Sequence, residues 1–268
     1  MYKLNTAQIQ WFDYLLIMTK KEIKSKYKNT TLGFLWIFIN PLSQMLVMGI
    51  IFGFFIPVEI DNYFLFLFTG LLPWNFFSHS ILQSTPSIVE ERDLVKKSNL
   101  NREVIVLSRV LSNMFHFLMS LFLLLIFLVI SQLIADPSVW HLAQYVFGFL
   151  RLIPYLIWIL VFTSGLALLF SAVNVRFRDL NFIVNAIVPL WFYATPITYS
   201  LNLLPSNLTT ILSFNPITPI IEGFQSVLLS TSMISEKFVL FHILVTLLLF
   251  MFAVLFFKKE NKDFADWI

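Results

Sequence analysis

Residues 115–130 read FHFLMSLFLLLIFLVI, and this run of phenylalanine, leucine and isoleucine decides the fold class. With its flanks it forms an apolar segment over 104–134, longer than the roughly 20 residues that a membrane-crossing helix needs. Further apolar segments lie at 32–55, 63–88, 147–173, 180–197 and 238–257. The sequence therefore predicts an all-α polytopic membrane protein with six transmembrane helices.

The composition excludes other classes of protein. Of the 268 residues, 58% are hydrophobic and only 12% are charged, and the mean hydropathy is +0.82. Soluble domains are nearer half apolar and a quarter charged, so an ordinary soluble globule and a disordered chain are both excluded. The absence of cysteine excludes a disulfide scaffold and a thiolate zinc site. The net charge of +3 matters less than its placement, and we expect no nucleic-acid partner.

The placement of positive charge predicts the orientation. Six crossings put all but two of the 18 lysine and arginine residues on one side of the membrane. The exceptions, Arg151 and Lys237, lie near helix ends, where long side chains can reach the interface. By the positive-inside rule both termini are cytoplasmic.

The N-terminal segment is predicted to be an amphipathic helix over residues 5–29. Its apolar residues share one helical face at three- and four-residue steps: Ile9, Phe12, Leu16, Ile23 and Tyr27. Lysines lie beside this stripe. Such a helix lies in the cytoplasmic headgroup layer on anionic lipid, either as a simple anchor or as a belt that also touches a partner. We therefore divide the chain into an interface helix, 1–30, and one six-span domain, 31–268.

Two loops differ from ordinary connectors. The cytoplasmic loop 89–103 contains EERDLVKKSNLNRE, whose leading acids and following lysines match the dipole of a short docking helix; the alternative is a solvated connector. The outer segment 198–236 has no Lys or Arg, and its charges are Glu222 and Glu236. We expect it to form two short re-entrant helices, roughly 201–213 and 217–230, because irregular backbone cannot face lipid. They act as a gate or as a structural cap, and Glu222 is a candidate for an aqueous path.

The sequence carries no chemistry of its own for ATP hydrolysis or hydrolytic catalysis. No GxxxxGK[ST] loop, HExxH, GxSxG or carboxylate pair occurs. The four histidines are scattered, and His79 and His116 are expected to be neutral packing residues within spans. Six spans more often form half a transporter, closed by a twofold-related copy, with energy supplied by a separate ATPase.

Four motifs carry a family resemblance. KYKNTTLGFLW at 26–36, followed by Asn40-Pro41-Leu42, resembles the start of span one in the membrane subunits of ABC exporters for polysaccharides, a type 2 ABC permease family that carries O-antigen, capsule and teichoic acid chains. GLLPWNFF at 70–77, NVRFRDL at 174–180, and TPITY at 195–199 with Asn215-Pro216 resemble later motifs in the same order. The family-motif positions are Leu32, Gly33, Trp36, Pro41, Arg178 and Asp179.

The resemblance implies a homodimer joined to two copies of a nucleotide-binding ATPase subunit. ATP and Mg²⁺ would bind that partner, so this chain would hold no cofactor and no metal. The substrate would be a glycan on polyprenyl diphosphate, moved outward across the bacterial inner membrane, with O-antigen as the preferred case. Residues 5–29 would form the interface helix, and 90–103 would hold the coupling helix that enters the ATPase.

Three groups of residues are candidates for this work, since aromatic rings can hold sugar faces loosely and cations attract a diphosphate. The substrate path is assigned to Trp74, Phe77, Trp191, Phe192, Tyr193 and the gate residue Tyr199. The cytoplasmic entrance is assigned to Lys24, Lys28 and Arg178. ATPase coupling is assigned to Glu90, Glu91, Arg92, Asp93, Lys96 and Lys97. Ordinary positive-inside placement and lipid- or core-facing rings are the alternatives.

Other functions remain open on the sequence. A teichoic acid or capsule exporter would use the same motifs. A drug or small-lipid ABC permease would respond to small hydrophobic compounds and not to a glycan lipid. A membrane-embedded enzyme acting on lipid-linked sugars would need His79, His116 or Arg151 for turnover, and a non-enzymatic scaffold would need no ATPase.

Overall fold

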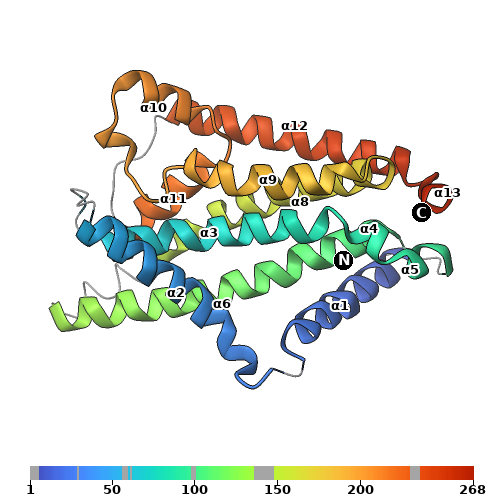
Figure 1. The fold of residues 1–268 in the computed structure, drawn as a ribbon, viewed down its shortest axis with the longest axis horizontal. Helices are drawn as coiled ribbons and strands as arrows, with labels where there is room; N and C mark the ends of the chain where they lie inside the picture. The colour runs from blue at the N-terminus through green and yellow to red at the C-terminus, as the bar shows by residue number, and fades with distance from the viewer. Residues whose placement is uncertain are drawn as a thin grey trace.

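The computed structural model describes residues 6–28, 30–55, 60, 62–97, 101–135, 148–229 and 236–268. Within these ranges the regular structure is helical, as the sequence predicts. The long helices run side by side in an elongated bundle (Figure 1). α1 (Thr6–Tyr27), α4 (Ser87–Glu90), α5 (Arg92–Lys97) and α13 (Phe264–Trp267) gather toward one end, which we call the basic end because it carries Lys96, Lys97, Lys258 and Lys259.

Five helical stretches are long and apolar enough to cross a membrane within the described residues: Gly33–Gly53, Tyr63–Ser84, Glu103–Ile130, Phe149–Arg176 and Lys237–Glu260. The first combines η1 (Gly33–Leu35), α2 (Trp36–Ile50) and the π-helical turn η2 (Ile51–Phe55). The others are α3 (Tyr63–Ser84), α6 (Glu103–Ala135), η3 (Phe149–Arg151) with α8 (Leu152–Arg176), and α12 (Glu236–Glu260). All five correspond to predicted spans, so the chain is a polytopic helical membrane protein.

The segment predicted as span five is shorter than expected. α9 (Asp179–Tyr193) has 15 residues, about 22 Å at 1.5 Å per residue, against a hydrocarbon core of about 30 Å. It runs beside α3 and α8 along the bundle (Figure 1). The helix ends two residues before Thr195-Pro196, where the chain turns. Length alone thus supports five spans in the described part of the chain, and the sixth crossing stays a prediction.

α3 is the central helix of the bundle. In its most apolar window 78% of the residues are buried, against 17% for the first and last spans. It contacts α2, α6, α8, α9 and α11. Small side chains on α3, such as Thr69, Ser80 and Ser84, are fully buried and let the neighbouring helices approach closely. Pro73 lies inside this helix, as Pro41 and Pro189 lie inside α2 and α9.

α8 and α12 pack together through a small residue and a polar pair. A Cβ added at Gly165 would lie 2.7 Å from a methyl carbon of Leu249 and 3.2 Å from the Phe250 Cα, so a larger residue would displace the Leu249 side chain and crowd the α12 backbone. The Trp158 Nε1–H donates a hydrogen bond to the Thr246 Oγ1 at 2.9 Å. Both groups are buried, which makes the bond part of the helix interface.

Short helices occupy the end opposite the basic end (Figure 1). The structure contains η4 (Leu201–Leu203), α10 (Ser206–Ser213) and α11 (Thr218–Leu229), close to the predicted helices at 201–213 and 217–230. α11 packs on α3 and α8 and is largely buried, whereas most of α10 is exposed. The two helices are confirmed, while their position in a membrane stays a prediction.

α1 has two apolar faces, of which the sequence pattern showed one. Phe12 and Leu16 from the predicted stripe are 50% and 56% exposed and are free to meet lipid. Leu15 and Met18 are buried instead, on a face of α1 that packs against α6. This second face continues to Lys26, in the last turn of α1.

Candidate functional site

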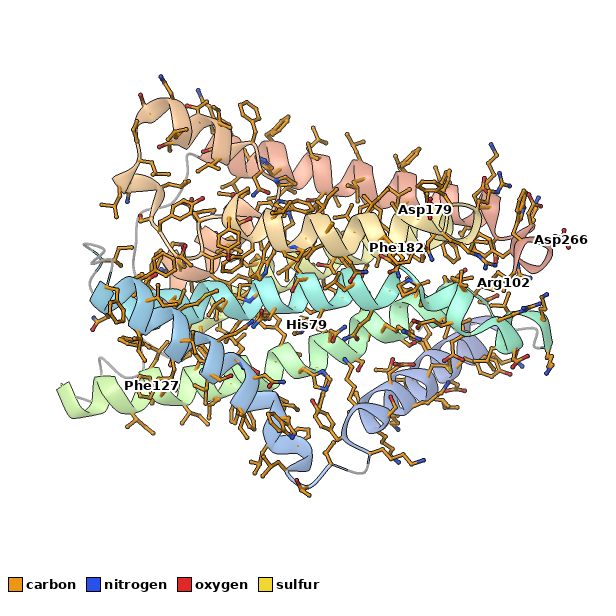
Figure 2. All side chains as sticks on the ribbon, viewed as in Figure 1. His79, Arg102, Phe127, Asp179, Phe182 and Asp266 are labelled. Atoms are coloured by element: carbon orange, nitrogen blue, oxygen red, sulfur yellow. The ribbon has the colours of Figure 1, made fainter. Side chains whose placement is uncertain are left out.

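A polar cavity of about 550 Å³ lies between α1, α2, α3 and α6. α3 contributes Asn75, His79 and Gln83, four residues apart and therefore on one helix face. Figure 2 shows His79 on the side of α3 where α6 lies. The other helices contribute Lys26 from α1, Asn40, Ser43 and Gln44 from α2, and Asn113, His116 and Ser120 from α6. Polar residues are expensive inside a membrane domain and mark functional sites there.

Amide side chains link the helices around the polar cavity. The Lys26 Nζ donates to the Asn113 Oδ1 at 2.7 Å, and the Asn113 Nδ2 donates to the Gln83 Oε1 at 3.2 Å. Farther along, the Asn75 Nδ2 donates to the Gln44 Oε1 at 2.7 Å. α1, α6 and α3 are thereby joined in one chain of hydrogen bonds that begins at an ammonium group.

The polar cavity is poor in negative charge. None of its described lining residues is Asp or Glu. Burial lowers the pKa of Lys26 to about 8; Glu22 one turn away opposes the shift and Arg109 adds to it. The His116 Nε2 is buried without a hydrogen-bond partner, next to the Tyr27 ring, whose centroid is 5.4 Å from the imidazole. The lining therefore offers donors and an ammonium to an incoming group.

The two histidines within the spans are scattered in the sequence, yet α3 and α6 bring both His79 and His116 into the polar cavity. Their expected role as neutral packing residues stays a prediction. The signal in the sequence was the four-residue spacing of Asn75, His79 and Gln83, which gives a polar stripe on an otherwise apolar span. Lys26 was also missed as a site residue.

The predicted path residues gather into one aromatic cluster. The ring centroids of Trp74 and Phe77 lie 5.5 Å apart, Trp74 and Phe192 5.6 Å apart, and Phe77 and Trp191 5.3 Å apart. Trp74, Phe77 and Phe192 are buried inside the chain, whereas Tyr193 is 66% exposed. The cluster thus joins α3 to α9, and its role in a path stays a prediction.

Asn215 fixes the turn after α9. Its Oδ1 accepts from the Trp191 Nε1–H at 2.9 Å, and its Nδ2 donates to the Ala194 carbonyl at 2.9 Å and to the Thr195 Oγ1 at 3.0 Å. The Tyr199 hydroxyl donates to the Tyr193 carbonyl at 3.2 Å. Glu222 is buried on α11 with 8% of its surface exposed. The predicted gate region is therefore a hydrogen-bonded turn against the aromatic cluster.

The predicted entrance residues do not line the polar cavity. Lys24, Lys28 and Arg178 are all exposed; Lys24 lies on α1, Lys28 immediately after it, and Arg178 immediately before α9. Lys26, between Lys24 and Lys28 in sequence, points to the opposite side and enters the cavity.

The predicted coupling residues divide into two sets. Glu91 accepts from the Lys21 Nζ at 3.0 Å and Glu90 from the Arg109 guanidinium at 2.8 Å, which ties this loop to α1 and α6. α5 confirms the predicted short helix, with Asp93 and Lys97 paired at 3.2 Å. Within α5 the exposed residues are Arg92, Asp93, Lys96 and Lys97, and Glu90, just before this helix, is exposed as well. α5 therefore presents a charged surface at the basic end.

The family-motif residues surround the α1–α2 junction and the start of α9. Gly33 has a φ of +49°, a left-handed conformation that favours glycine. Trp36 and Pro41 line the polar cavity, and Leu32 caps η1 with much of its side chain exposed. Arg178 and Asp179 begin α9.

The second hollow in the described residues differs in character. It measures about 930 Å³ and lies between η3, α8, α11 and α12. Most of its lining is apolar, including Ile153, Val227 and Ile243. Apolar surface on a spanning helix meets lipid, so this hollow alone indicates no reaction or polar ligand.

No metal centre is evident, since among the described residues no three His, Cys, Asp or Glu side chains gather as metal ligands. The candidate functional features are therefore the polar cavity, the aromatic cluster and the charged surface of α5.

Comparison with known proteins places the chain. The family model for the ABC-2 type transporter matches residues 14–229. The O-antigen export system permease protein RfbA of Myxococcus xanthus is 31% identical over the full length of both chains. The protein of the same name from Klebsiella pneumoniae is 30% identical over 95% of each chain. The polysialic acid transport protein KpsM of Escherichia coli is 21% identical over 75% of this chain and 76% of its own.

These matches cover the α1–α2 junction, all of α3, α6, α8 and α9, and the turn at Asn215. They agree with five apolar spans and with a sequence that lacks a phosphate-binding loop. The chain belongs to the ABC-2 type transporter family and is a multi-pass membrane permease subunit.

Proposed function

We propose that this chain is the transmembrane subunit of an ATP-driven exporter that moves a lipid-linked polysaccharide of the O-antigen type across the cytoplasmic membrane. The observation that carries the proposal is its similarity to an O-antigen export permease over the full length of both chains. A sugar chain is bulky and presents C–H faces, which aromatic rings can contact without fixed hydrogen bonds. The aromatic cluster between α3 and α9 supplies such rings.

In this proposal the basic end is cytoplasmic and carries both termini. α9 completes the membrane crossing as span five, with its turn held by Asn215, and α10 and α11 form the re-entrant outer gate. The interface helix over residues 1–30 lies on the membrane surface, and residues 31–268 form a single domain. The exposed Phe12 and Leu16 of α1 support this placement, because an apolar face next to lysines suits the headgroup layer.

The working unit would be two copies of this chain with two ATPase subunits that bind ATP and Mg²⁺. α9 offers a face for the second copy, since Phe182 and Leu190 are 74% and 69% exposed. α5 offers the charged surface for the ATPase, while Glu90 and Glu91 anchor it to the bundle. Closure of the ATPase subunits would move α5 and through it α2, α3 and α9, parting the gate helices.

The lipid diphosphate would be attracted at the cytoplasmic entrance by Lys24, Lys28 and Arg178, which are exposed cations. The glycan would follow the outer side of α9, where Tyr193 is exposed and Tyr199 is bonded to its carbonyl. Trp74, Phe77, Trp191 and Phe192 would hold α9 in place and reach the glycan when the dimer opens.

A capsule polysaccharide is the second candidate substrate. The polysialic acid transport protein supports it with similarity over three quarters of this chain. The higher identity and the full coverage of the O-antigen permeases favour the first candidate.

Co-purification with the ABC ATPase subunit, followed by ATP hydrolysis in lipid vesicles, tests the proposal. We expect a stable complex of two plus two subunits, with hydrolysis stimulated by glycan on polyprenyl diphosphate and not by small hydrophobic compounds. A chain that binds no ATPase on co-expression, or hydrolysis stimulated only by small hydrophobic compounds, would contradict it.

A further inference from the structure

The polar cavity has the chemistry of an anion site. Its donors converge from three helices: the Lys26 ammonium from α1, the Gln83 amide from α3 and the His116 imidazole from α6. No carboxylate stands among the described lining residues, and the His116 Nε2 is buried without a partner. The part-buried Lys26 ammonium bonds to a neutral amide, and Glu22, whose charge acts on it from one turn away, lies outside the cavity lining, so no described carboxylate inside the cavity pairs with it. An anion in the cavity would supply the missing partner.

The location of the polar cavity suits a lipid. From Leu72 to Gln83 it follows α3 for roughly 16 Å, so it extends from the α1 side deep into the bundle. Its wall also contains Trp36, which is 39% exposed at the start of α2. Beyond it, α2 exposes apolar residues such as Leu46 and Val47. A ligand here can place a charged head beside Lys26 while its acyl tail stays next to the apolar face of α2.

We propose that the polar cavity binds the phosphate group of a membrane lipid, with Lys26 as the charged contact, Gln83 and His116 as the hydrogen-bonding groups, and Asn113 holding the Lys26 ammonium in place. The volume of about 550 Å³ is ample for a phosphate headgroup with its first tail carbons. The lipid joins the end of α1 to α2 and α3, which are otherwise linked across the cavity by amide contacts. Two lipids carry a phosphate group that fits this site, an anionic phospholipid and a polyprenyl diphosphate, and the experiment distinguishes between them.

The test is lipid binding by the full chain purified in neutral detergent, measured by native mass spectrometry. The added probes are phosphatidylglycerol, polyprenyl diphosphate, diacylglycerol as a phosphate-free lipid, and inorganic phosphate as a competitor. Lys26→Met removes the charge and keeps the stem. Lys20→Met is the matched control, because Lys20 lies on the same helix, is exposed and does not line the cavity.

We expect one retained phosphate lipid that Lys26→Met weakens about tenfold or more and Lys20→Met leaves unchanged, since a charge-assisted hydrogen bond contributes about 1.5–3 kcal/mol. Asn113→Asp is a second variant that keeps the shape and the Lys26 contact but places a repelling carboxylate in the cavity, so it should weaken binding similarly. It keeps the test valid if Lys26→Met does not fold.

The outcomes are separable. Tighter binding of phosphatidylglycerol identifies a membrane phospholipid, and tighter binding of polyprenyl diphosphate identifies a carrier lipid; both support the proposal. Equal loss in Lys26→Met and Lys20→Met, no preference over diacylglycerol, or full competition by inorganic phosphate at comparable concentration would overturn it. Because no transport is measured, this result does not depend on the exported polymer.

Discussion

At the scale of the residue, Lys26 differs from the exposed lysines of the basic end because its side chain lines the polar cavity. Burial and Arg109 lower its pKa to about 8 against the opposing effect of Glu22, while the entrance lysines Lys24 and Lys28 are exposed. The pKa of an amine in such a cavity changes more on binding a charged ligand than the pKa of a solvated lysine does.

Lys26 should titrate near pH 8, and its stability effect has a definite sign. The folded pKa lies below the unfolded value of 10.5, so between about pH 8 and pH 10.5 the unfolded chain binds more protons. Stability relative to Lys26→Met should therefore rise with pH in that window and be flat below it. NMR of ¹³C-methylated lysines, assigned by the Lys26→Met spectrum, gives the midpoint. A midpoint near 10.5 without ligand would contradict the buried position.

Asn215 should be the residue on which the turn after α9 depends most. Asn215→Ala removes partners from the Trp191 indole and the Ala194 carbonyl and should cost about 1–3 kcal/mol of stability. Thermal melting of the purified protein in detergent measures the loss. Asn207→Ala, at an exposed position of α10, is the control and should melt like the wild type. Equal melting of both variants would show that Asn215 does not hold the turn.

At the scale of the element, the charged surface of α5 should bind the ATPase subunit. Lys96→Glu reverses a charge on the exposed helix and should reduce co-purification of the ATPase severalfold, because interface charges fix register and partner choice. Lys259→Glu makes the same charge change at the end of α12, outside α5, and should leave it intact. Equal losses in the two variants would indicate general electrostatic attraction and not docking at α5.

The helices themselves could largely be predicted from sequence. Apolar length gave α2, α3, α6, α8 and α12, and charge order with proline positions gave α5, α10 and α11. The sequence-based prediction made α9 too long, because the apolar composition continues to Ile197. In the structure the backbone turns near Thr195, where it is held by hydrogen bonds from Asn215, twenty residues later in the chain. Pro196 is the local signal for this stop, since proline disfavours helix in the residue before it, while the Asn215 contacts are tertiary and leave no signal near α9.

The candidate site was predicted less well than the helices. The aromatic residues from α3 and α9 do gather, but burial of Phe77 and Trp74 depends on how the helices rotate, which composition does not specify. The polar cavity was missed because its residues are spread over four helices. Each helix contributes only a few polar positions, and their convergence on Lys26 becomes visible only when α1 is docked against α6.

At the scale of the whole molecule, the charged surface of α5, the polar cavity and the aromatic cluster occupy different parts of the bundle. α5 and α13 lie at the basic end, and α10 and α11 lie at the opposite end (Figure 1). The polar cavity lies where α1 meets α2, and the aromatic cluster joins α3 to α9. Substrate and energy thus enter by the same end in our account. α9 and α12 both expose apolar residues, and in our proposal these faces meet a second copy and lipid.

The central claim is ATP-driven export of a lipid-linked polysaccharide, and a flipping assay in sealed vesicles tests it most directly. Vesicles containing this chain and its ATPase, with the ATPase facing outward, are loaded with glycan on polyprenyl diphosphate in the outer leaflet. We predict that ATP makes the glycan resistant to added glycosidase, whereas an ATPase variant unable to hydrolyse ATP does not. Glycan that stays fully digestible with ATP in an intact complex, or becomes protected equally without ATP, would contradict the account.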